Sequence, residues 1–148
     1  MPQIEIAVIV MRDAVNVLIV KPLIGPDAGK WIIPMDAVNE GEKLIEAAER
    51  VVKDQCGLST IPKRILFPLE IVEPDYHHVV LVGFSECGSS GEPKPAEGRL
   101  SDARFVDPRS LVDYQNEGMS AISARAFANF SLILVEQARA AAPRSGTV

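Results

Sequence analysis

The chain begins with two apolar runs separated by a short break. These runs, Gln3–Met11 and Val15–Lys21, are rich in β-branched residues. Two such runs with so short a separation predict a β-hairpin. Residues Leu23–Lys30 contain two glycines and a proline, which is typical of a loop, and Trp31–Ile33 then predicts a short strand. The first third of the chain is therefore expected to contribute strands to a sheet.

The next segment has helical spacing. Apolar residues recur every three or four positions from Lys43 to Cys56, with charged residues between them, which predicts an amphipathic helix. Glu40 and Glu42 lie at its N-terminal end, where carboxylates suit the helix dipole, and Gly57 follows it at the position of a C-terminal cap. The apolar stripe consists of Leu44, Ala47, Ala48, Val51 and Val52.

The second half of the chain repeats the strand pattern before a final helix. Runs Arg64–Glu73 and His77–Glu86 predict a second hairpin, and Cys87–Gly98 is rich in Gly, Ser and Pro and predicts a loop. Ala103–Val106 predicts a closing strand, and the stripe in Met119–Ala140 predicts the last helix. Pro108 starts a short turn through Leu111 between these two elements.

The order of strands, helix, strands and helix favours an α+β fold in which a mixed β-sheet is sandwiched between α-helices. No repeat or long linker divides the chain, so residues 1–141 are expected to form a single domain and residues 142–148 a flexible C-terminal tail.

Composition excludes several classes of function. Hydrophobic residues make up 47% of the chain and charged residues 24%, which indicates neither disorder nor a fibrous protein. The net charge of -5 leaves no basic surplus for nucleic acid. Cys56 and Cys87 have no CxxC partner and are expected to be free thiols. The apolar N-terminal run has no basic flank and is too short to span a bilayer, so we expect a cytoplasmic protein without a membrane partner.

Residues 36–58, called the signature segment below, resemble the Nudix box. The family pattern is Gly, five residues, Glu, seven residues, then Arg-Glu-apolar-x-Glu-Glu-x-Gly-apolar. Anchored on Gly57, the chain matches it without a gap at Glu42, Arg50, Val52, Gly57 and Leu58. The lead-in Trp31-x-x-Pro34 and the segments 78–82 and 101–106 extend the resemblance over most of the chain. It implies the Nudix fold, with Glu42 and Arg50 forming a structural ion pair.

The signature segment departs from the family where the chemistry lies. In the family, the clustered glutamates bind magnesium or manganese around a diphosphate, because hard dications require oxygen ligands. Here Val51, Asp54 and Gln55 occupy those positions, so the resemblance leaves Asp54 as the remaining metal ligand and catalytic candidate. Met35 and Asp36 replace a Gly pair whose backbone conformation they are expected to adopt less readily.

A rebuilt site is the alternative. The family sometimes uses an acidic residue from the loop before the closing strand as ligand or general base, and Glu97 has that place here, with Asp102 nearby. Together with Asp54 and Glu49, these residues would hold a metal that activates water. The plainer interpretation is that Asp54 and Glu97 are solvated surface residues, that His77 and His78 are ordinary strand residues, and that Trp31 is a core anchor.

Three functions remain open from the sequence. The first is a Nudix-family protein that binds a nucleotide or other diphosphate-containing small molecule, with weak or absent pyrophosphohydrolase activity. The second is an active hydrolase of a nucleoside diphosphate derivative, with magnesium or manganese at the rebuilt site. The third is a scaffold or assembly subunit, for instance a homodimer, that uses the last helix. This helix is apolar nearly all round at Phe127, Phe130, Leu132, Ile133, Leu134 and Val135.

Overall fold

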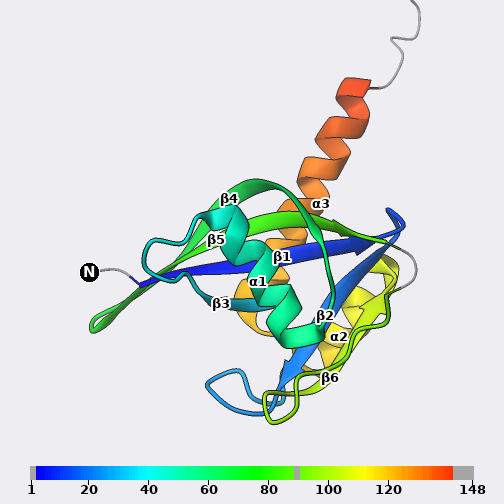
Figure 1. Ribbon diagram of the computed structural model, residues 1–148. Helices are drawn as coiled ribbons and strands as arrows, with labels where there is room; N and C mark the ends of the chain where they lie inside the picture. The colour runs from blue at the N-terminus through cyan, green and yellow to red at the C-terminus, as the bar shows by residue number, and fades with distance from the viewer. Residues whose placement is uncertain (1–2, 89–90, 142–148) are drawn as a thin grey trace, which may run out of the picture.

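One mixed sheet runs through the middle of the molecule (Figure 1). The computed structural model describes residues 3–88 and 91–141, and within them the sheet has six strands. The strands are β1 (Gln3–Arg12), β2 (Asn16–Pro22), β3 (Met35–Ala37), β4 (Ile61–Glu73), β5 (Tyr76–Cys87) and β6 (Leu100–Val106). The helices of this part are α1 (Leu44–Cys56), the single 3₁₀ turn η1 (Pro108–Ser110), α2 (Leu111–Gly118) and α3 (Ala121–Ala141).

The strands follow the order β4-β5-β1-β2-β6, and β3 pairs with β1 on the side that faces β2. β1 and β5 are parallel, and the other pairs are antiparallel. β1 pairs with β2 at its C-terminal end through Met11 and Arg12, and with β3 through residues 5–7. β3 and β2 therefore lie on the same side of β1, β3 near its beginning and β2 at its end.

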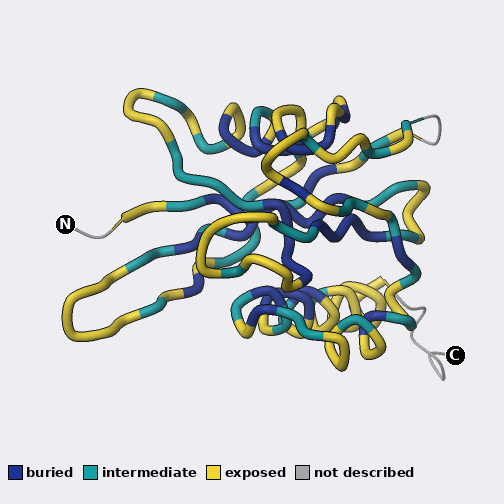
Figure 2. The backbone as a smooth tube through the Cα atoms, turned by 90° about the horizontal axis from the view of Figure 1, so that it is seen from below, coloured by how far each residue is buried: buried dark blue, intermediate teal, exposed yellow. Residues whose placement is uncertain are grey.

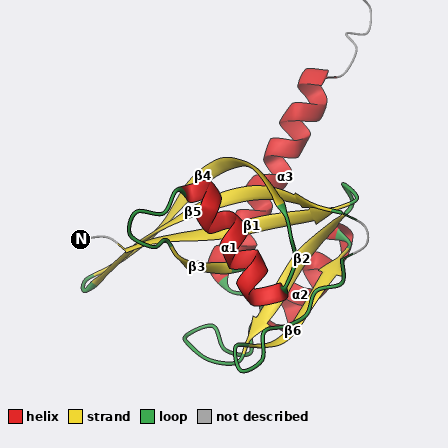
Figure 3. Ribbon diagram, viewed as in Figure 1, coloured by secondary structure: helices red, strands yellow, loops and turns green. Residues whose placement is uncertain are grey.

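β1 separates two hydrophobic cores, one on each face of the sheet. Ile6, Val8 and Val10 pack in the core beneath α1, whereas Ala7 and Ile9 pack in the core beneath α3. This division follows from the alternation of side chains along a strand. The helices cover both faces, as Figure 2 shows from below and Figure 3 by element type. The expected mixed sheet between helices is confirmed.

The prediction of a strand at Trp31–Ile33 is wrong. Trp31 and Ile32 form isolated bridges, and the strand in this region is β3, which begins after Pro34. Ile32 exchanges backbone hydrogen bonds with Val20 of β2, whereas the carbonyl oxygen of Pro34 accepts one from Val8 of β1. The segment crosses from one strand to another, so no continuous ladder forms over residues 31–34.

Three other boundaries differ from expectation. β4 begins at Ile61 rather than at residue 64, and β6 begins at Leu100 rather than at residue 103. β4 is an edge strand with register shifts near Pro62, and an edge strand tolerates a proline there because the missing N–H has no ladder partner to lose. The turn expected at 108–111 continues into α2, whose one buried side chain, Leu111, gives no helical stripe to read from the sequence.

Only the first half of α3 packs on the sheet. Its buried residues are Ser123, Ala126, Phe127 and Phe130, and the helix then extends past the body of the protein (Figure 1). None of the helices in the described part of the chain is long and apolar enough to cross a membrane. The tail expected at residues 142–148 lies outside the described residues.

Candidate functional site

An ion pair fixes the loop that leads into α1. The Arg50 Nε donates to Glu42 Oε2 over 2.7 Å, and its Nη2 donates to Glu42 Oε1 over 3.0 Å. The same Nη2 donates to the carbonyl oxygen of Ala37 over 2.9 Å. Gly57 ends α1 in the left-handed conformation with φ of 68°. The ion pair expected from the signature segment is present, and it joins β3, the loop and the helix.

The ion pair predicts a pH-dependent stability. Hydrogen bonds from Arg50, and then from the backbone of Asn39, lower the pKa of Glu42 below its ordinary value of 4.5. A carboxylate with a lowered pKa stabilises the fold fully above its unfolded-state pKa and loses that contribution as pH falls through its folded-state pKa. Glu42→Gln is therefore expected to lower the melting temperature at pH 7, and this difference from wild type is expected to shrink below pH 4.5. Thermal melts from pH 7 to pH 3 measure this difference in melting temperature.

The control is Glu49→Gln, at an exposed position on α1. A difference for Glu42→Gln that stays constant with pH would contradict the lowered pKa of Glu42.

The three positions that replace the family glutamates do not share one surface. Val51 is fully buried at 0% exposure in the core beneath α1, and Gln55 is 5% exposed. Asp54 points outward with 49% of its side chain exposed, and its Oδ2 lies 3.7 Å from Arg50 Nη1. Asp54 therefore lies on the outer side of the helix, whereas Val51 and Gln55 face the sheet.

Gln55 is bonded at one end of its amide and not at the other. Its Nε2 donates to the carbonyl oxygen of Met35 over 2.9 Å. Its Oε1 is buried and has no hydrogen-bond partner among the described residues. The carbonyl oxygen of Met35 requires a donor, which fixes the orientation of the amide. The amide N–H of Gln55 thus occupies a direction from which a cation could otherwise contact the Met35 carbonyl oxygen.

Met35 and Asp36 do not adopt an unusual backbone. In the described chain, positive φ outside glycine occurs at Asp13 and Ala14, not at these two residues. Both belong to β3, where Asp36 pairs with Ile6 and Met35 with Ala7. The expected difficulty of replacing the family glycines is corrected, because ordinary extended backbone forms here.

Asp36 links two cationic side chains from distant parts of the chain. Its Oδ2 lies 3.3 Å from Arg99 Nη2 and 3.8 Å from Arg50 Nη1. Arg99 comes from the turn just before β6, 63 positions along the chain. Sequence analysis missed Arg99, and its one available signal was a new acidic residue at the position of the first family glycine. The Asp36–Arg99 pair bridges β3 and the loop before β6.

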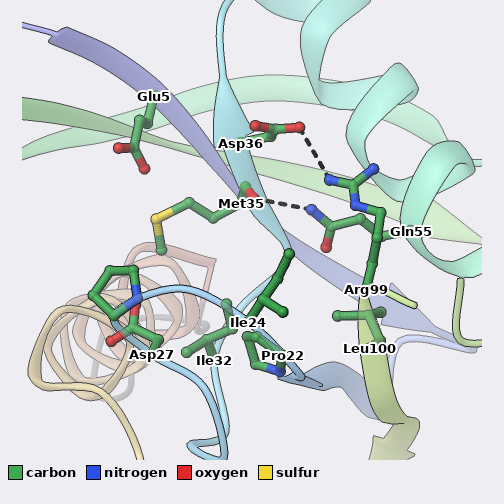
Figure 4. A pocket seen from close by; sticks show the side chains of 11 residues that line it. Glu5, Pro22, Ile24, Asp27, Ile32, Met35, Asp36, Gln55, Arg99 and Leu100 are labelled. Atoms are coloured by element: carbon green, nitrogen blue, oxygen red, sulfur yellow. Dashed lines mark hydrogen bonds and ion pairs between the residues drawn. The ribbon is translucent and has the colours of Figure 1, made fainter. Parts of the chain in front are cut away.

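Met35, Asp36, Gln55 and Arg99 line a cleft of about 320 Å³. Figure 4 shows Asp36 above the guanidinium group of Arg99 and Met35 beside the amide of Gln55, with Glu5 at the upper left and Asp27 at the lower left. The cleft is lined by β3, by the end of β2 and the loop that follows it, by Gln55 of α1 and by the start of β6. Its charged lining consists of Glu5, Asp27, Asp36 and Arg99, which are three carboxylates and one guanidinium.

Glu5 extends the acidic character of the cleft into the sheet. Its Oε1 lies 2.7 Å from His78 Nδ1, and the ring of His78 stacks on that of Tyr76. Burial raises the pKa of Glu5, and the carboxylates of Asp36 and Asp27 raise it further, while His78 opposes them. The neighbouring His77 lies 2.9 Å from Glu70 on the exposed surface. His78 therefore pairs with a carboxylate that lines the cleft, although it does not line the cleft itself.

The acidic residues expected to rebuild a metal site do not come together as one cluster, although Glu49 and Asp54 line one pocket beside Arg50 on the outer side of α1. Glu97, Glu49 and Asp54 are exposed, and the carboxylate of Asp102 pairs with Arg104. Within residues 3–88 and 91–141, no group of three or more His, Cys, Asp or Glu side chains is placed to hold a metal ion. Val51 offers no oxygen, and Gln55 presents an N–H to the one carbonyl beside it. The residues present therefore do not fit a divalent ion.

Two other sequence features take no part in the cleft. Cys56 and Cys87 are free thiols, as expected, and burial raises the pKa of Cys56 to about 12, so it stays protonated at neutral pH. Trp31 is 2% exposed in the core beneath α3, and its Nε1 donates to Glu117 over 2.7 Å. Its role as a core anchor is confirmed.

Comparisons with known proteins agree with this architecture. Solved structures with the same fold include a NUDIX hydrolase from Nitrosomonas europaea, with 15% identity, coverage of 89% of this chain and 90% of that one, and a TM-score of 0.75. A MutT NUDIX hydrolase from Burkholderia pseudomallei matches with 20% identity, coverage of 86% and 97%, and a TM-score of 0.73. The NUDIX domain of Shewanella oneidensis NrtR complexed with ADP ribose matches with 16% identity, coverage of 94% and 87%, and a TM-score of 0.67. At these identities the likeness shows the fold alone. No curated protein shows significant sequence similarity to the chain. The family model of the NUDIX domain matches residues 1–130, and the chain therefore belongs to the Nudix family.

Proposed function

We propose that this Nudix protein binds a nucleotide or another diphosphate-containing small molecule and has weak or absent pyrophosphohydrolase activity. The observation that carries the proposal is the hydrogen bond from Gln55 Nε2 to the carbonyl oxygen of Met35. The uncharged amide of Gln55 donates a hydrogen bond to the Met35 carbonyl oxygen, so this oxygen has a partner without a bound dication. Binding then needs no metal, whereas the family's anhydride cleavage does.

Two further observations support a protein that has lost hydrolysis but still binds its ligand. Val51 is sealed in the core, and the single carboxylate of the trio, Asp54, faces outward beside Arg50. The cleft itself is open, with a volume of about 320 Å³, near the lower end of the roughly 300–1,000 Å³ usual for ligand sites. The Shewanella NUDIX domain with bound ADP ribose shows one ligand that this fold can accept.

A binding and turnover comparison tests the proposal. Isothermal titration calorimetry with ADP-ribose and the nucleoside triphosphates is expected to detect binding that is unchanged between EDTA and magnesium or manganese. The same mixtures, followed by phosphate release or by chromatography of the products, are expected to show no metal-dependent cleavage. Rapid turnover with either metal would overturn the proposal.

The active-enzyme alternative makes the opposite prediction at two residues. It depends on Asp54 and Glu97, both exposed, as ligand and general base. Should turnover be found, Asp54→Ala and Glu97→Ala would have to abolish it. Activity that survives both substitutions would exclude this rebuilt site.

The exposed apolar side chains in the second half of α3 favour one further role for the protein, in which this half-helix forms the contact surface of a homodimer. Leu132, Leu134 and Val135 are 62%, 42% and 49% exposed on a helix that extends past the sheet (Figure 1). Contiguous exposed apolar side chains are costly in water and mark association surfaces. Multi-angle light scattering is the test: a mass of twice 16.0 kDa that falls to the monomer value in Leu132→Asp supports the dimer, and a monomeric wild type excludes it.

A further inference from the structure

The unpartnered oxygen of Gln55 tells which part of a ligand the cleft accepts. Gln55 is 5% exposed and lines the cleft, and its Oε1 lacks a hydrogen-bond partner among the described residues. Figure 4 shows the amide nitrogen turned toward Met35 and the oxygen turned away from it. A buried acceptor without a donor is costly, so a ligand that brings a donor to this point gains the full benefit of pairing it.

A phosphate group cannot provide that donor. Phosphate esters at neutral pH carry oxygens that accept hydrogen bonds and almost no O–H groups that donate them. A hydroxyl or an amino group donates, and it does so without adding negative charge. The oxygen of Gln55 therefore selects against the anionic end of a nucleotide and for its nucleoside end.

The charges around the cleft point the same way. Glu5, Asp27 and Asp36 line it, and its one cationic side chain, Arg99, already pairs with Asp36 over 3.3 Å. A diphosphate without a bound dication would enter a region with two carboxylates in excess, and like charges repel most strongly where water is partly excluded. Carboxylates also accept hydrogen bonds from hydroxyl and amino groups, so Glu5 and Asp27 favour the same ligand as Gln55 does.

We propose that the cleft recognises the uncharged, donor-bearing part of a nucleotide, its ribose hydroxyls or base amino groups, through Gln55 Oε1 with Glu5 and Asp27 as further acceptors. The phosphates then lie outside the cleft and contribute little to affinity. This inference rests on the proposed nucleotide-binding function and names the group that the site reads. Gln55 thus acts as a specificity-determining residue in place of a metal ligand.

Calorimetric titrations in EDTA test the inference with defined probes. Adenosine, guanosine, cytidine and uridine are compared with their 5′-diphosphates. The tightest nucleoside is expected to bind within about tenfold of its diphosphate, and inorganic pyrophosphate is not expected to displace it. The 2′,3′-dideoxy form of that nucleoside then separates the two sources of the donor: a loss of affinity assigns it to the ribose, and unchanged affinity assigns it to the base.

A variant pair locates the effect at Gln55. Gln55→Leu keeps a side chain of similar length without the acceptor and is expected to weaken nucleoside binding about tenfold or more, the worth of one buried hydrogen bond. Lys53→Gln, at an exposed position of the same helix that does not line the cleft, is the control and is expected to bind as wild type. Circular dichroism tests whether each variant is folded. If Gln55→Leu is unfolded, the pyrophosphate competition in the wild-type protein decides the question.

The outcomes separate this inference from the function on which it rests. A diphosphate that binds more than about tenfold tighter than its nucleoside, or displacement by pyrophosphate, would overturn the inference while nucleotide binding stands. Unchanged affinity in folded Gln55→Leu would overturn it as well. Absence of binding by every nucleoside and nucleotide would overturn both.

Discussion

Val51→Glu is expected to destabilise the protein by about 4 kcal/mol or more, which corresponds to a fall of roughly 10 °C or more in melting temperature. The substitution restores a glutamate of the family pattern, yet the side chain at this position is 0% exposed between α1 and the sheet. Its neighbours in that core include Ile6, Val8 and Leu18, which offer a carboxylate no hydrogen bond. Thermal and urea denaturation measure the effect.

Val51→Ala is the matched control for that substitution. It removes volume at the same position without adding charge and is expected to cost about 2 kcal/mol. If Val51→Glu proved as stable as wild type, residue 51 would have to reach solvent, and the separation of Val51 from the outer surface of α1 would be wrong. Restoration of the family cradle by glutamates at residues 51 and 55 together therefore meets a folding cost before any gain in metal binding.

Gln55→Glu is expected to make the stability of the protein depend on divalent ions, whereas the stability of the wild type is expected not to. The substitution removes the N–H that bonds the carbonyl oxygen of Met35 and sets a buried carboxylate against it, at a cost of about 3 kcal/mol in EDTA. The same two oxygens form the beginning of a cation site, so millimolar manganese or magnesium is expected to recover part of the lost melting temperature.

Gln55→Leu separates the two effects, since it removes the donor without adding a carboxylate. It is expected to lose about 1 kcal/mol and to show no response to manganese. Melting curves of wild type, Gln55→Glu and Gln55→Leu in EDTA and in manganese provide the comparison. A rise in the wild-type melting temperature as large as that of Gln55→Glu would show that the amide does not replace a metal, and would favour the active-enzyme alternative.

These experiments all concern one junction, where α1, β3 and the turn before β6 meet. Gln55 of α1 donates a hydrogen bond to Met35 of β3. Asp36 of the same strand forms an ion pair with Arg99, and Arg50 of α1 contacts both Ala37 and Asp36 of β3. Neutral and paired groups therefore hold these elements together in the described structure. The proposed function rests on these contacts.

The sequence by itself determined the parts of the fold that depend on neighbouring residues. α1 runs from Leu44 to Cys56 and ends at Gly57, as its spacing and cap predicted, because helix periodicity and a left-handed glycine are local properties. The ion pair of Glu42 with Arg50 was implied by the family resemblance and is present. The strands were found because long apolar runs were bounded by turns.

Only the tertiary structure decided which groups meet in the cleft. β3 was missed because its partner, β1, lies some 30 positions earlier, and nothing in the three residues Met35–Ala37 marks a strand. Arg99 reaches Asp36 across 63 positions, and His78 reaches Glu5 through a parallel pairing that no local pattern specifies. The outward turn of Asp54 and the inward turn of Gln55 follow from the apolar stripe of α1, because residue 55 continues the stripe of Val51 and Val52 and residue 54 does not. The stripe does not tell which carbonyl group, cation or strand these side chains meet. Those partners come from segments far apart in the chain, so the chemistry of this site, unlike its helix, could not be read from the sequence.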